Sequence, residues 1–208
     1  MKTHFIFDFD DTLTNSYDVN QQLFVDTFIP YLPKLDETYL RDLHFRSRGK
    51  SMHLQFEEAV KYINLKIDPQ KLVEENEKLH IDNADKFNSM NAFESVKELL
   101  ETVRTKGKKI SICTNRQYGS QKIILEKNGL TKYFDNVISC LDEGHEKPDP
   151  YCLLKLIEKY DEPKDNYIYF GDSKTDHDFA QNAGIDFIII DQYLNQKKFF
   201  KMVLQAFF

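Results

Sequence analysis

Short apolar runs recur along this chain, and helix-forming patterns separate them. The runs are rich in β-branched and aromatic residues, and there are five of them: Phe5–Phe7, Ile110–Cys113, Val137–Ile138, Tyr167–Phe170 and Phe187–Ile190. Runs of this length and composition are typical of strands that are buried on both faces. Because strand and helix patterns alternate, the sequence predicts an α/β protein with a Rossmann-like parallel sheet flanked by helices.

One long segment, from about residue 17 to residue 90, shows helical spacing and no strand pattern. Apolar residues recur on one helical face twice, first at Val19, Leu23, Phe24 and Phe28, and then at Met52, Phe56, Val60 and Ile63. Asp68 and Pro69 have the order of an N-cap and a first helical residue. We therefore expect an all-helical domain at 17–90, inserted after the first strand of a core domain formed by 1–16 and 91–208.

The composition excludes several classes of function. The 208 residues include 28 basic and 34 acidic side chains, a net charge of −6, so the chain has no general positive field for nucleic acid or anionic membranes. Its 41% hydrophobic content is enough to form a core. The longest apolar run, Phe187–Ile190, is too short to span a bilayer.

Cysteine usage and the amino-terminal residues indicate a cytoplasmic protein. Cys113, Cys140 and Cys152 are odd in number and form no CxxC pair, which argues against a disulfide framework and against a zinc site. Phe5–Phe7 leads directly into Asp8, so no secretory leader is expected.

Acidic residues follow the first apolar run. Asp8 and Asp10 are two positions apart, so both side chains point the same way at the carboxyl edge of the sheet, where open α/β sheets bind ligands. Two such carboxylates repel each other unless a cation lies between them, and Mg²⁺ suits hard oxygen ligands. The alternative is a solvated acidic turn.

Three later segments place polar residues in corresponding positions. The second run is followed by Thr114, Asn115 and Arg116. Thr114 could have a functional role, and the alternative is that it is a cap or turn residue. Lys147 precedes a proline that restricts the backbone, although isolated lysines are usually solvated. The fourth run is followed by the carboxylates of Asp172 and Asp176. They could be functional, and the alternative is that they cap the N-terminus of a helix. Each motif is ambiguous alone, but the four motifs follow one another at successive strand ends of one sheet.

With these motifs, the sequence resembles the haloacid dehalogenase superfamily. The matching features are DxDxT at Asp8, Asp10 and Thr12, the strand-terminal Thr114, the Lys147-Pro148 pair, and GDxxxD at Asp172 and Asp176, followed by Ala180, Ala183 and Gly184. The helical insertion resembles the C1 cap of phosphoglycolate phosphatase-like and β-phosphoglucomutase-like members. The 33 positions from Thr114 to Lys147 are too few for the alternative cap of other members.

The resemblance implies a role for each matching residue. Asp8 would be the nucleophile and become an aspartyl phosphate, and Asp10 would be the general acid and base. The phosphoryl oxygens would be held by Thr114 and Lys147, with Asn115 and Arg116 at the border of that pocket. The Mg²⁺ ligands would be Asp8, the Asp10 carbonyl and Asp172. Thr12 and Asp176 would support this shell from outside, Asp176 by orienting Lys147 or a metal-bound water.

Two further features bear on the substrate. Members that attack carbon lack an acid two positions after the nucleophile, so Asp10 favours phosphorus chemistry. Asp11 departs from the family, in which most members have glycine there. In the insertion, the segment 45–51 contains Arg46, Arg48 and Lys50 and resembles the substrate-specificity loop of C1-capped members, where these cations would meet a second anionic group. The alternative is a solvated loop between helices.

These observations predict a Mg²⁺-dependent phosphatase of a small phosphorylated metabolite, acting as a monomer or homodimer without a nucleic-acid or membrane partner. A phosphomutase of the β-phosphoglucomutase type would share every catalytic residue. A third possibility is a binding or regulatory protein that has the fold without turnover, although the complete set of catalytic residues argues against it.

Overall fold

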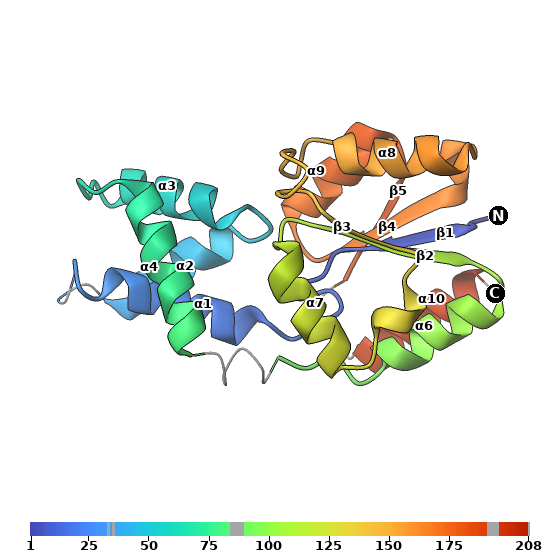
Figure 1. The fold of residues 1–208 in the computed structure, drawn as a ribbon, viewed down its shortest axis with the longest axis horizontal. Helices are drawn as coiled ribbons and strands as arrows, with labels where there is room; N and C mark the ends of the chain where they lie inside the picture. The colour runs from blue at the N-terminus through green and yellow to red at the C-terminus, as the bar shows by residue number, and fades with distance from the viewer. Residues whose placement is uncertain (33, 35, 84–89, 191–195, 208) are drawn as a thin grey trace. The chain divides into compact units, whose positions relative to one another are not determined.

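The computed structural model describes residues 1–32, 34, 36–83, 90–190 and 196–207. It contains a sheet of five parallel strands in the order β3-β2-β1-β4-β5 (Figure 1). The strands are β1 (His4–Phe7), β2 (Lys109–Thr114), β3 (Asn136–Ser139), β4 (Tyr167–Gly171) and β5 (Asp186–Ile189). β1 lies at the centre, where Phe7 pairs with Ile112 of β2 and with Phe170 of β4. The predicted α/β class is confirmed.

Helices cover both faces of the sheet. α8 (Tyr151–Tyr160) and α9 (Lys174–Ala183) lie on one face, while α6 (Val96–Thr105), α7 (Tyr118–Lys127) and α10 (Gln196–Phe207) lie on the other (Figure 1). Under α8 and α9, the buried apolar residues of the sheet and helices form one cluster that includes Ile6, Cys113, Tyr169, Leu153 and Phe179. Short 3-10 turns, Thr131–Tyr133 and Lys164–Asn166, precede β3 and β4.

The prediction that all five strands are buried on both faces is wrong for the edges. β1 and β4 are buried at every position, whereas Ile189 of β5 is 57% exposed and three of the four residues of β3 are half-buried. An edge strand has one neighbour instead of two, and its apolar side chains are covered from fewer directions. Local composition does not distinguish an edge from a central strand.

The predicted helical insertion is present. Its described helices are α1 (Tyr17–Phe28), α2 (Glu37–Arg46), α3 (Met52–Tyr62) and α4 (Pro69–Asp82). The rings of Phe24 and Phe56 stack with centroids 5.1 Å apart and form the centre of a separate apolar core. Asp68 caps α4 as its spacing indicates, because its carboxylate accepts a hydrogen bond from the Gln70 N–H at 3.0 Å.

The chain divides into two compact units. One comprises Met1–Asn15 with Asn91–Phe208, and the other is Ser16–Met90. Positions 84–89, near the end of the expected insertion, lie outside the described residues. The sheet unit therefore has two separate stretches of chain, and its first strand comes from the shorter one.

Candidate active site

Asp8 is placed at the carboxyl edge of the sheet by the strands on either side of it. It follows β1 directly, and its main-chain N–H donates to the Phe170 carbonyl of β4 at 2.8 Å. The residue is only 3% exposed, and its Oδ1 is fully buried. A buried carboxylate oxygen in this condition needs a cation or another polar partner.

Lys147 supplies one positive charge to Asp8. Its ammonium Nζ lies 2.9 Å from Asp8 Oδ1 and 2.6 Å from Asp176 Oδ1, and its side chain is 1% exposed. The Lys147 backbone is held by Asn115, whose Oδ1 accepts from the Lys147 N–H at 2.9 Å and whose Nδ2 donates to the Lys147 carbonyl at 3.4 Å. The Asn115 amide thus contacts the lysine segment, although the sequence predicts a phosphate contact.

Asp176 is fully buried, and protein donors engage both of its oxygens. Oδ1 accepts from Lys147, while Oδ2 accepts from the Ser173 N–H at 3.1 Å and from the Ser173 hydroxyl at 2.5 Å. Ser173 and Asp176 form the capping box of α9. The helix cap and the lysine contact, which the sequence treats as alternatives, therefore occur together at this one residue.

Tyr169 is a component of the site that the sequence analysis did not identify. Its hydroxyl donates to the Cys113 carbonyl at 2.8 Å, accepts from Lys147 Nζ at 3.3 Å and lies 3.1 Å from Asp176 Oδ1. Because Tyr169 is a strand residue in an apolar run, its pattern is that of a core residue. Its hydroxyl reaches the site only because β2 and β4 lie on either side of β1.

The electrostatics of this cluster follow from its burial. Burial raises the pKa of Asp8 to about 7, with a further increase from Asp176, and Lys147 opposes both effects. For Lys147 burial works against the charged form, but Asp176 and Asp8 more than compensate and raise its pKa above the usual value. The carboxylates of Asp176 and Asp8 therefore favour the charged form of the lysine in this site.

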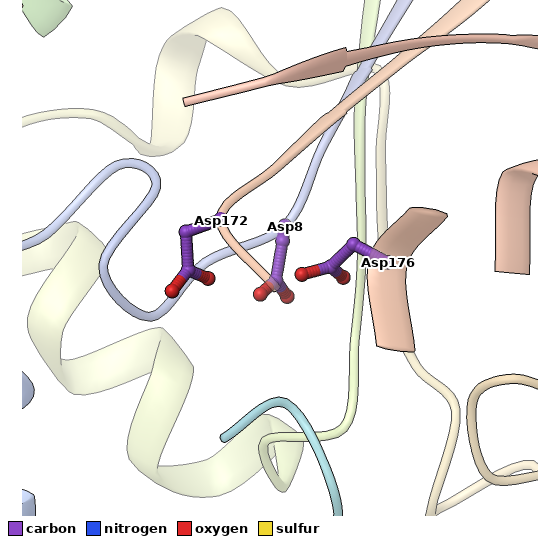
Figure 2. A group of neighbouring side chains, drawn as sticks. All are labelled: Asp8, Asp172 and Asp176. Carbon is purple, nitrogen blue, oxygen red and sulfur yellow. The ribbon is translucent and has the colours of Figure 1, made fainter. Parts of the chain in front are cut away.

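A metal ion fits the acidic group at this edge. One carboxylate oxygen from each of Asp8, Asp172 and Asp176 lies within 4.8 Å of the other two, and Asp8 lies between the other side chains in Figure 2. When all three carboxylates are ionised, they carry two negative charges more than the one ammonium of Lys147 offsets, and one divalent cation would neutralise these. Carboxylate oxygens such as those of Asp8 and Asp172 are the hard ligands that suit Mg²⁺.

The Asp10 side chain is not part of this acidic group. Its carboxylate accepts from Arg116 at both oxygens, with Nε 2.8 Å from Oδ2 and Nη2 2.7 Å from Oδ1. The sequence predicts Arg116 at the border of a phosphate pocket, and in the structure its guanidinium holds Asp10. Thr114, at the end of β2, is buried, and its hydroxyl accepts from the Arg116 N–H at 3.2 Å.

Two residues of the first motif have distinct local environments. Thr12 is fully buried, and its hydroxyl has no hydrogen-bond partner among the described residues. Asp11, where most members of the family have glycine, has a left-handed backbone with φ of 56°. Glycine adopts that conformation without steric cost, and aspartate is among the few other residues that tolerate it. Asp11 begins a short turn, residues 11–13, that directly follows Asp10.

The three cations expected in a specificity loop belong to the helical unit. Arg46 forms an ion pair with Asp42 at 2.8 Å, and Lys50 forms one with Glu58. The guanidinium of Arg48 lies over the Phe45 ring, 4.2 Å from its centroid.

Comparison with known proteins agrees with the fold and with the expected family. A family model for haloacid dehalogenase-like hydrolases matches residues 5–190. The chain belongs to this family and is an enzyme, a hydrolase. It is similar to pyrophosphatase PpaX of Bacillus cereus strain G9842, with 28% identity over 180 residues, which cover 86% of this chain and 78% of the relative.

Solved structures share the fold at lower identity. A haloacid dehalogenase-like protein from Bacteroides fragilis matches with a TM-score of 0.79 and 23% identity, covering 99% of this chain and 93% of that one. A predicted phosphoglycolate phosphatase from Haemophilus somnus 129PT matches with a TM-score of 0.75 and 20% identity, covering 95% and 91%. Among the described residues, no helix has the length and apolar character needed to cross a membrane.

Proposed function

We propose that this enzyme is a Mg²⁺-dependent phosphatase that hydrolyses a small phosphorylated metabolite through an aspartyl phosphate on Asp8. The observation that carries the proposal is a buried carboxylate, Asp8, that lies 2.9 Å from the buried ammonium of Lys147 and within 4.8 Å of a carboxylate oxygen of Asp172. Phosphoryl transfer mainly needs positioning and charge neutralisation, and this arrangement supplies both.

The proposed reaction has two steps. Asp8 attacks phosphorus in line, the bond from phosphorus to the leaving oxygen breaks, and Asp10 gives its proton to that oxygen. Asp10 then takes a proton from a water molecule, whose oxygen attacks phosphorus while the bond to Asp8 breaks. Lys147 and Thr114 hold phosphoryl oxygens, and Asp176 and Asn115 hold Lys147.

Mg²⁺, when bound by Asp8, Asp172 and the Asp10 carbonyl, supplies the charge that allows a phosphate dianion to approach a carboxylate. The helical unit acts in this proposal as the cap that selects the substrate. Its loop with Arg46, Arg48 and Lys50 would meet a second anionic group, either a carboxylate or a second phosphate. Inorganic pyrophosphate is one such compound, and the name of the Bacillus relative supports its inclusion in a test.

The test is a screen of the purified protein against phosphorylated metabolites and pyrophosphate, with Mg²⁺ and with a chelator. We expect phosphate release that requires the metal. Asp8→Asn should abolish it, whereas Asp165→Asn, an exposed aspartate outside the site, should leave it unchanged. Metal-independent turnover, or full activity of Asp8→Asn, would overturn the proposal. A requirement for a sugar bisphosphate, with the phosphoryl group returned to a sugar phosphate, would instead identify a phosphomutase.

A further inference from the structure

The guanidinium of Arg116 is committed to Asp10. It donates to both carboxylate oxygens, at 2.7 Å and 2.8 Å, and the side chains are 9% and 28% exposed. A two-point contact between a planar guanidinium and a carboxylate fixes the rotation of the carboxylate as well as its position. A single ammonium group cannot do this.

Arg116 is itself anchored from several directions. Its main-chain N–H donates to Thr114 at 3.2 Å, its Nη1 donates to the Ser120 hydroxyl at 3.4 Å, and its guanidinium lies 5.8 Å from the centre of the Phe9 ring. Although 106 residues separate Arg116 from Asp10, they follow the neighbouring parallel strands β2 and β1 and so meet at one edge of the sheet.

We infer that Arg116 is a positioning residue that holds the Asp10 carboxyl where it exchanges protons with the leaving oxygen and the attacking water. This inference rests on the proposed function, in which Asp10 performs those transfers. The family motifs place a nucleophile, an acid, a hydroxyl and a lysine, and Arg116 is an additional residue of this chain. A direct contact of Arg116 with phosphate is the competing explanation, and it predicts different kinetics.

The experiment compares two substrates that differ in their need for a proton at the leaving oxygen. The nitrophenolate of p-nitrophenyl phosphate leaves without much protonation, whereas the alkoxide of glycerol 2-phosphate needs it. Asp10→Asn should therefore lower kcat/KM far more for glycerol 2-phosphate than for p-nitrophenyl phosphate. Arg116→Met should shift the ratio in the same direction, by about 10- to 100-fold, since small misplacements of a catalytic group have effects of this size.

Three comparisons make the test specific. The ratio of the two kcat/KM values does not depend on the fraction of enzyme that is folded, so partial unfolding of a variant does not produce the effect. Arg116→Lys should recover part of the ratio, and Arg116→Met should add little when Asp10→Asn is already present. Arg104→Met removes another contact between an arginine and an aspartate in the same unit, in which Arg104 Nη1 donates to both carboxylate oxygens of Asp135, and it should leave the ratio unchanged.

The outcomes separate the inference from the proposed function. If Asp10→Asn shifts the ratio but Arg116→Met does not, Asp10 acts as proposed and the inference about Arg116 is overturned. Equal losses for both substrates with a raised KM, adding fully to the effect of Asp10→Asn, would also overturn it and identify Arg116 as a phosphate ligand. If Asp10→Asn itself leaves the ratio unchanged, the proposed role of Asp10 fails and the inference fails with it.

Discussion

Gly171, the last residue of β4, has no room for a side chain. A Cβ at this position would lie 2.4 Å from Cβ and 2.5 Å from Cγ of Asp176, whereas ordinary contacts begin at 3.4 Å. Gly171→Ala therefore requires the aspartate or the strand to move by about 1 Å, and the neighbour that gives way is fully buried. The same movement lengthens the 2.6 Å contact between Asp176 and Lys147.

Two costs combine in the Gly171→Ala variant. Overpacking a core position costs about 1–3 kcal/mol, and complete loss of one partner of a buried ion pair costs about 3–5 kcal/mol. Because the pair is displaced and not removed, we expect the free energy of unfolding to fall by about 2–4 kcal/mol. Activity should fall by about 100-fold, since Lys147 no longer holds its position beside Asp8.

Stability is measured by urea unfolding followed by circular dichroism at 222 nm, since the chain has no tryptophan to report by fluorescence. Activity is measured as phosphate release in the presence of Mg²⁺. Gly119→Ala is the matched control. This glycine is the second residue of α7, and an added Cβ there meets no atom within 4 Å, so alanine should stabilise the protein by about 0.4–1 kcal/mol by reducing the freedom of the unfolded chain. If Gly171→Ala unfolds at the same urea concentration as the natural protein and retains its activity, the proposed clash with Asp176 does not occur.

Two further predictions concern pH and metal binding. Burial, with smaller effects from Arg48 and Arg41, lowers the pKa of His44 to about 4, so between pH 6.5 and 4 only the unfolded chain takes up this proton, and stability falls as the pH is lowered. The loss of stability at pH 5 relative to pH 7 is about 2 kcal/mol. The free energy of unfolding of His44→Gln, measured in urea, should lack this part of the pH dependence. The same pH dependence in both proteins would show that His44 is not its source. Mg²⁺ at 100 times its Kd should stabilise the folded protein by about 2.7 kcal/mol, seen as a higher Tm. Asp172→Asn should need a much higher Mg²⁺ concentration for the same shift, and an unchanged titration would exclude Asp172 as a ligand.

The sequence by itself determined the fold class and the positions of the motifs. Periodicity identifies an apolar strand such as Tyr167–Phe170 and an amphipathic helix such as Val96–Thr105, because both patterns depend on neighbours within a few residues. Motif spacing located Asp8 and Asp172 at strand ends for the same reason. A parallel sheet then requires those ends to lie at one edge.

Only the tertiary structure decided which side chains contact one another at that edge. Asn115 holds the backbone of Lys147, Arg116 holds Asp10, and Tyr169 reaches Lys147 from within an apolar strand. These contacts join segments 22 to 106 residues apart. They depend on the order and register of strands, which local patterns do not encode, and the exposure of Ile189 at the sheet edge has the same physical cause.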